Sequence, residues 1–262
     1  MKQLYTSKGL AFGGGTADRR AYKEAQFDLL AEGVRSSIDT ELLYRIIRGG
    51  DMMELEYVLP KDIERRSFEL IEAELGDRKL PEEIRPIVMR AIHTTADFDY
   101  YDNMYFSEGA VQKALSAIES GAVFVTDTNM ARSGINKAAL ARHGCTVECF
   151  MADPDVAEKA AAEGTTRAAA SVDKAAELGR PVIYAVGNAP TALIRLCEHI
   201  KSGSFVPELV IGVPVGFVNV VQSKELIIES GIPCIAARGR KGGSNVAAAI
   251  CNALLYMADG RK

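Results

Sequence analysis

The chain has 262 residues, of which 48% are hydrophobic and 25% charged, and its formal net charge is −4. This composition is that of a globular protein with a substantial core, as one domain or one domain with an appendage. The acidic balance and the lack of a long basic run argue against a nucleic-acid partner. No apolar run is long enough to span a bilayer, and the first residues lack the apolar core of a secretory signal, so we expect a cytoplasmic protein that does not act in a membrane.

The cysteines predict a reduced protein without a metal site. Five cysteines, an odd number, lie in apolar contexts, as is typical of cysteines in a cytosolic core. His143, Cys145 and Cys149 are close in sequence, but no second metal-ligand motif accompanies them. We therefore expect a strand in this segment and no bound metal.

The N-terminal segment differs in pattern from the rest of the chain. A glycine-rich turn at 13–15 is followed by two helical patterns that end at Gly49 and Gly50. We predict a helical extension over residues 1–52 and one larger domain over residues 53–262. Helices without strands are expected first in this domain, over 60–75 and 81–92.

After residue 110 the chain alternates between helical patterns and short apolar runs. The runs predict strands over 122–125, 146–151, 181–186, 209–213 and 233–236. Amphipathic helices are expected over 111–119, 155–162, 167–178, 191–201 and 245–257. This alternation predicts an α/β fold, with a doubly wound, mostly parallel sheet and helices on both faces.

Four of these strands run into polar loops that contain Gly or Pro, at 126–130, 187–191, 214–217 and 238–244. In a parallel sheet, such loops gather at the carboxyl edge, where ligands bind. Glycines allow close backbone approach, and Arg167, Arg238, Arg240 and Lys241 add positive charge, so the edge suits an anionic ligand. Tight turns alone would explain most of the glycines, but they explain the nearby cations less well.

His93, one of three histidines, ends a helical pattern and precedes a polar segment. Imidazole exchanges protons near neutrality, which makes His93 a candidate acid/base group, although many such histidines are only caps or surface residues. Arg90 lies three residues earlier and shares its helical face. Asp127, Asp97 and Asp99 could assist, but aspartates near turns are usually caps. Phosphate-loop and nucleophile-elbow motifs are missing, so the residues alone indicate an enzyme or carrier for a polyanion.

Several segments together resemble one family, the precorrin-8X / cobalt-precorrin-8 methylmutases. They are YVLPKDIERRSF (57–68), IHTTADFD (92–99), TDTNMARSGINK (126–137), TTRAAASVD (165–173), GNAPTALIRL (187–196), GVPVGFV (212–218), QSKE (222–225) and GRKGGSNVAAAICNALLY (239–256). The resemblance covers about residues 55–257 in continuous order. The forms HTTADFD and GRKGGSNVAAAI are more similar to the cobalt-precorrin-8 branch.

The resemblance implies an isomerase of cobalamin biosynthesis that moves a methyl group from carbon 11 to carbon 12 of cobalt-precorrin-8 to give cobyrinate. It implies a flavodoxin-like fold, a homodimer with the site at its interface, a corrinoid substrate and product, and no separate cofactor. The alternative hypothesis, from a different class of function, is a carrier that binds a corrinoid in the same crevice at the carboxyl edge and catalyses no reaction. A third hypothesis is a nucleotide-binding α/β protein.

The resemblance also assigns residues. The catalytic histidine falls on His93, and substrate-contacting positions fall on Ser67, Arg90 and Arg167. The remaining substrate-binding residues that we expect are Thr95, Asp127, Asn188, Gly216, Arg240, Lys241, Gly243 and Ser244. We further expect Thr94, Thr95 and Asp97 to set the tautomer and the pKa of His93.

Overall fold

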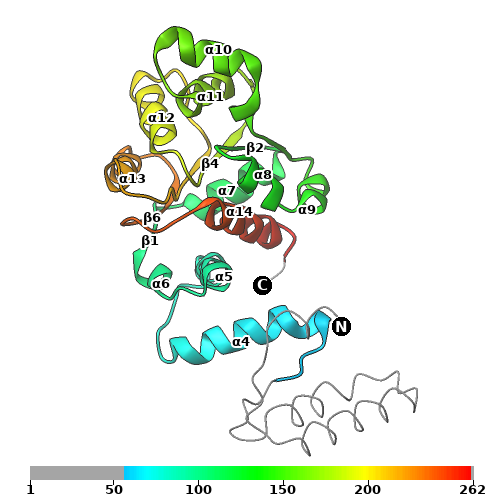
Figure 1. The fold of residues 1–262 in the computed structure, drawn as a ribbon. Coiled ribbons are helices and arrows are strands. Elements are labelled where there is room, and N and C mark those ends of the chain that lie inside the picture. The colour runs from blue at the N-terminus through cyan, green and yellow to red at the C-terminus, as the bar shows by residue number, and fades with distance from the viewer. Residues whose placement is uncertain (1–55, 261–262) are drawn as a thin grey trace, which may run out of the picture. The chain divides into compact units, whose positions relative to one another are not determined.

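The structure is a computed structural model that describes residues 56–260 (Figure 1). The chain divides into two compact units, Met1–Asp62 and Ile63–Lys262. Of the first unit the structure describes residues 56–62, which include the short 3-10 helix η1 (Pro60–Asp62). The predicted helical extension over residues 1–52 lies outside the described residues. Everything that follows concerns the second unit.

The second unit contains a six-stranded sheet with the order β1-β6-β5-β4-β2-β3. The strands are β1 (Met104–Phe106), β2 (Val123–Thr126), β3 (Thr146–Glu148), β4 (Val182–Val186), β5 (Leu209–Gly212) and β6 (Cys234–Ala237). Strands β2 to β6 pair in parallel, and only β1 runs antiparallel, with Tyr105 opposite Ala236 of β6. Counted from β2, the parallel strands follow the flavodoxin-like order 2-1-3-4-5. The predicted mostly parallel, doubly wound sheet is confirmed.

Helices cover both faces of this sheet (Figure 1). On one side lie α5 (Arg85–Thr95), α7 (Ala110–Glu119), α8 (Asn129–Gly134), α9 (Lys137–Arg142) and α14 (Ser244–Ala258), and α4 (Ile63–Leu75) packs on α5. On the other lie α10 (Pro154–Glu163), α11 (Arg167–Ala176), α12 (Pro190–Ser202) and α13 (Val220–Glu229). Successive residues of each strand point to opposite faces of the sheet and so belong to two separate hydrophobic cores. Phe124 and Ile183 face α7 and α14, while Val125 and Tyr184 face α11 and α12.

Several elements differ from the sequence prediction. The stretch expected to hold helices without strands continues into α6 (Asp99–Asn103) and the edge strand β1, whose apolar run of three residues is too short to predict a strand. Helices α8, α9 and α13 were not expected, and the predicted strand over 146–151 ends at Glu148, where the 3-10 helix η2 (Phe150–Ala152) follows. The remaining predicted strands lie within one residue of their observed ends.

The structure of residues 56–260 contains no helix that is both long and apolar enough to cross a lipid bilayer.

Candidate active site

Helix α5 presents His93 and Arg90 on one face. Its opposite face, which includes Val88, Ala91 and Ile92, is buried in the core shared with α14. This burial fixes the rotation of the helix, so residues 90 and 93 project toward α4. Their side chains meet α4 there, one helical turn apart.

Phe68 of α4 lies between these two side chains. Its ring centroid is 5.1 Å from that of His93, and the Arg90 guanidinium carbon is 5.4 Å from the same centroid. Ser67, the preceding residue, donates a hydrogen bond from Oγ to the Ile63 carbonyl at 2.8 Å. The structure thus brings the predicted residues Arg90 and His93 together around the ring of Phe68, which follows the third predicted residue, Ser67, in the sequence.

Arg90 is held in place from several sides. Its Nη1 donates to Glu64 Oε1 at 2.9 Å, and its guanidinium carbon lies 4.8 Å from the ring centroid of Tyr256 on α14. The Arg90 side chain is only 19% exposed. Stacking between two aromatic rings and an ion pair together leave few rotamers, so the guanidinium is preorganised beside His93.

The side chains of the turn that follows His93 contact partners other than the imidazole. Thr95 Oγ1 donates to the Ala91 carbonyl at 2.8 Å, and Asp97 Oδ2 accepts from Lys241 Nζ at 2.6 Å. The expectation that Thr94, Thr95 and Asp97 set the tautomer and the pKa of His93 stays a prediction. The side chains of Thr95 and Asp97 stabilise the turn, with Asp97 Oδ1 accepting from the Asp99 amide at 3.0 Å.

Asp127 fills the carboxyl edge between β2 and β4, the point at which a flavodoxin-like sheet binds its ligand. Its carboxylate is 1% exposed and accepts the backbone N–H groups of Gly187, Asn188 and Ala189 at 2.7 to 2.8 Å. Burial raises the pKa of Asp127, and the three amide donors oppose that rise. The side chain faces the protein interior and fixes the 187–189 loop, while Asn188 is exposed beside it.

The other loops of this edge are joined to one another. Thr128 Oγ1 and Ser244 Oγ are 2.8 Å apart, the Gly216 amide donates to the Arg240 carbonyl at 3.1 Å, and the Gly243 amide donates to the Val213 carbonyl at 2.9 Å. The predicted gathering of loops at one edge is therefore observed. Direct contacts between the loops occupy the switch point.

The cations of this edge are largely paired. Lys241 Nζ lies 2.6 Å from both Asp97 Oδ2 and Asp99 Oδ2, which raises the pKa of Lys241 and, chiefly through the same hydrogen bond, lowers that of Asp97. Arg238 pairs with Glu225 at 3.0 Å. All four expected cations are exposed, and the other two lie outside these ion pairs. Arg240 stacks over the 82% exposed ring of Phe217, and Arg167 opens helix α11.

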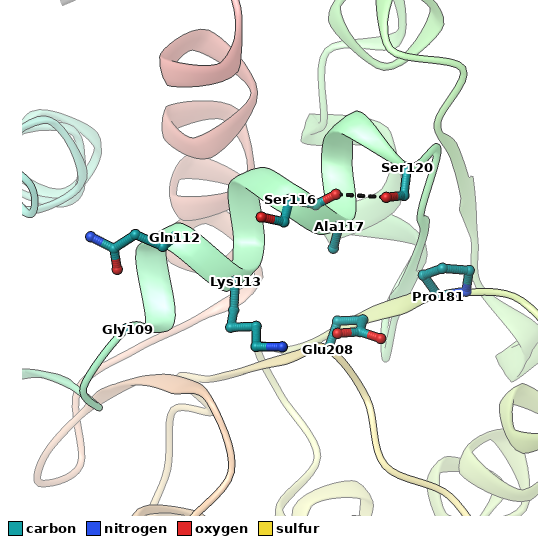
Figure 2. A pocket seen from close by; sticks show the side chains of 8 residues that line it. All are labelled: Gly109, Gln112, Lys113, Ser116, Ala117, Ser120, Pro181 and Glu208. Carbon is teal, nitrogen blue, oxygen red and sulfur yellow. Dashed lines mark hydrogen bonds between the residues drawn. The ribbon is translucent and has the colours of Figure 1, made fainter.

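A separate hollow of about 430 Å³ lies at the opposite, amino edge of the sheet. Lys113 and Ser116 of α7 line it together with Pro181 and Glu208, which precede β4 and β5 (Figure 2). None of the predicted site residues lines this hollow. Its lining includes no histidine and none of the acid/base candidates from the sequence, so the candidate site is the one at α4, α5 and the carboxyl edge.

Some residues of the site were not identified from the sequence. Phe68, Glu64 and Tyr256 surround Arg90, and buried Lys224 anchors the loop that carries Lys241. The first two lie within four residues of Ser67, where a contact with α5 could have been suspected. Tyr256 and Lys224 give no local signal, because their partners are distant in sequence.

Together the fold and the site define a flavodoxin-like α/β protein whose switch point is occupied by its own side chains and whose candidate acid/base group lies on a covering helix. A sequence model of the precorrin-8X methylmutase family matches residues 62–257. A cobalt-precorrin-8 methylmutase of Priestia megaterium is 44% identical over 202 residues, which are 77% of this chain and 90% of the relative. One of Salmonella typhimurium is 46% identical over 203 residues, with coverages of 75% and 95%.

Among solved structures, the precorrin-8x methyl mutase of Thermus thermophilus superimposes with a TM-score of 0.71 at 40% sequence identity. The match covers 77% of this chain and all of that one. The chain therefore belongs to the precorrin-8X methylmutase family. It is an isomerase of cobalamin biosynthesis, as the sequence resemblance predicted.

Proposed function

We propose that this chain moves a methyl group from carbon 11 to carbon 12 of cobalt-precorrin-8, giving cobyrinate, with His93 as proton donor and acceptor. The observation that carries this proposal is the placement of His93 beside the preorganised guanidinium of Arg90, across the Phe68 ring. The relatives from Priestia megaterium and Salmonella typhimurium, both called cobalt-precorrin-8 methylmutases, support the cobalt form of the substrate.

The chemistry requires little beyond such a site. A methyl shift within a conjugated ring is an internal rearrangement, so every atom of the substrate is retained in the product. A proton delivered to the ring by protonated His93 makes the ring electron-poor and eases migration, and the imidazole recovers that proton afterwards. Arg90, and the hydroxyl of Ser67 once it leaves its helical carbonyl, would hold one edge of the macrocycle through its carboxylate side chains.

We also propose that the protein acts as a homodimer in the cytoplasm with the site at the interface. Ile63 and Leu70 of α4 are about half exposed near Ser67, at 52% and 50%, which supports contact with a second copy. All five cysteines are free and buried, which supports a reducing compartment. Sedimentation equilibrium of the purified full chain tests the dimer.

Turnover is tested by incubating the full chain with cobalt-precorrin-8 and following the absorbance change as the chromophore rearranges. We expect His93→Ala to reduce kcat by about 100-fold or more while the protein still binds the corrinoid product. His143→Ala is the matched control, since His143 pairs with Asp259 away from this site. Binding without a spectral change in the unaltered protein would indicate a carrier, and full turnover by His93→Ala would refute the role of His93.

A further inference from the structure

The backbone directly after His93 has a conformation that its sequence does not favour. Ala96, the residue that ends α5, has φ 52° and ψ 33°, in the left-handed region that residues with a Cβ rarely adopt. Only one other residue with a side chain, Asn219, has a positive φ in the described part of the chain. Such a turn persists only where surrounding contacts hold it.

Those contacts converge on residues 95–99, here called the Ala96 turn. The Ala96 amide donates to the Ile92 carbonyl at 2.7 Å, and the Asp97 amide donates to Thr95 Oγ1 at 3.3 Å. Asp97 and Asp99 then present one carboxylate oxygen each to Lys241 Nζ, both at 2.6 Å. The ammonium group thus ties the middle and the C-terminal end of the strained segment to a loop on the carboxyl edge.

That loop is itself anchored from inside the protein. Lys224 of α13 is fully buried, and its Nζ donates to the carbonyls of Gly239 and Lys241 at 2.9 and 2.8 Å. The carbonyl between them, that of Arg240, accepts the Gly216 amide at 3.1 Å. Three consecutive carbonyl groups are therefore held, which fixes the point from which the Lys241 side chain reaches the Ala96 turn.

We propose that Lys241, anchored by Lys224, is a positioning residue that holds the Ala96 turn in its left-handed conformation and thereby fixes His93 against its ligand. This inference rests on the proposed role of His93. It assigns Lys241 a different task from the substrate contact that its position on the anionic-ligand edge suggested. The two tasks differ in kinetics, because a substrate contact mainly changes KM, whereas loss of His93 alignment mainly changes kcat.

The first test is steady-state turnover of cobalt-precorrin-8 by Lys241→Met. We expect kcat to fall about tenfold with KM within about twofold of the unaltered enzyme. Lys174→Met is the matched control, because Lys174 bridges Asp153 and Asp155, a second pair of aspartates two residues apart, at 2.7 Å each. A raised KM with unchanged kcat in Lys241→Met would overturn the proposal in favour of substrate binding.

A second substitution tests the cause. Glycine adopts the left-handed region without a Cβ clash, so adding Ala96→Gly to Lys241→Met should restore about threefold or more of the lost kcat. Lys224→Met should lower kcat in the same way with Lys241 intact. If Lys224→Met fails to fold, the double substitution Asp97→Asn and Asp99→Asn removes the ion pairs with Lys241 from the side of the Ala96 turn. It should lower kcat in the same way.

A readout without turnover separates this proposal from the proposed function. With three histidines in the chain, the ring nitrogen signals of His93 can be assigned by NMR of histidine-labelled protein using His93→Gln. We expect these signals to shift or broaden in Lys241→Met and to keep their positions in Lys174→Met. Unchanged His93 signals in Lys241→Met would overturn the positioning role of Lys241. Signals that shift in Lys241→Met, in a protein that shows no turnover even when unaltered, would overturn only the proposed function.

Discussion

The carboxyl and amino edges of the sheet differ in how closely their loops approach one another. At the carboxyl edge, a Cβ on Gly187 would lie 2.7 Å from Ser244 Cα, inside the backbone of another loop. At the amino edge, Gly109 precedes α7 at φ +69°, and the nearest atom to a Cβ there is Gln112 Oε1 at 4.0 Å. Glycine thus allows interlocking at one edge and only a change of chain direction at the other.

This difference explains where chemistry can be organised. Because the carboxyl-edge loops touch, each residue there sets the position of a neighbour, and Asp127 and Lys224 act through such contacts. The amino-edge hollow is open to solvent, and the hydrogen bond drawn between its lining residues, from Ser120 Oγ to the Ser116 carbonyl at 2.9 Å, lies within the chain of α7 and its end and joins no two loops (Figure 2). Rigid, mutually supporting loops are what a site with defined geometry requires.

The largest effect is expected from Gly187→Ala. The added methyl group meets the backbone of Ser244 rather than a flexible side chain, so the two loops must separate and the amides held by Asp127 are disturbed. We expect a loss of at least about 3 kcal/mol in the free energy of unfolding, measured by urea denaturation. Gly109→Ala, which adds only the strain of a positive φ, should lose about 1 kcal/mol. Equal losses would contradict the difference between the edges.

How much of this was predictable depends on the distance between partners in the sequence. Apolar runs such as 182–186 located the strands, and the polar loops after them located the carboxyl edge. The burial of Asp127 could not be foreseen, since the three amides that it accepts lie about 60 residues further along the chain. The pairing of Lys241 with Asp97, 144 positions earlier, escaped prediction for the same reason, and so did the short edge strand β1.

A second, somewhat smaller effect concerns pH and Lys224. Burial lowers the pKa of Lys224 to about 8, from 10.5 in an exposed chain. Between these values the unfolded state binds more protons than the folded state, so the contribution of Lys224 to stability rises with pH. We expect the stability difference between the unaltered protein and Lys224→Met to widen by about 2 to 3 kcal/mol from about pH 7.5 to about pH 10.5.

Urea denaturation of both proteins at each pH measures that difference, and the subtraction removes the titration of groups that the two share. A gap that stays constant over this range would mean that Lys224 has the same pKa in the folded and the unfolded protein. Burial would then not disfavour its charged form, and the two hydrogen bonds to Gly239 and Lys241 would be donated by an ammonium group throughout the range.

The smallest effect compares two exposed cations, one at each edge. Arg240 stacks on Phe217 at the carboxyl edge, whereas Lys113 projects into the amino-edge hollow opposite Glu208 (Figure 2). If the substrate carboxylates meet only the carboxyl edge, Arg240→Met should raise KM for cobalt-precorrin-8 about fivefold with kcat unchanged. Lys113→Met should leave both constants in place, because no bound anion would be lost. A KM increase of similar size in Lys113→Met would show that the hollow contacts substrate, and the functional distinction between the two edges would then fail even where their packing differs.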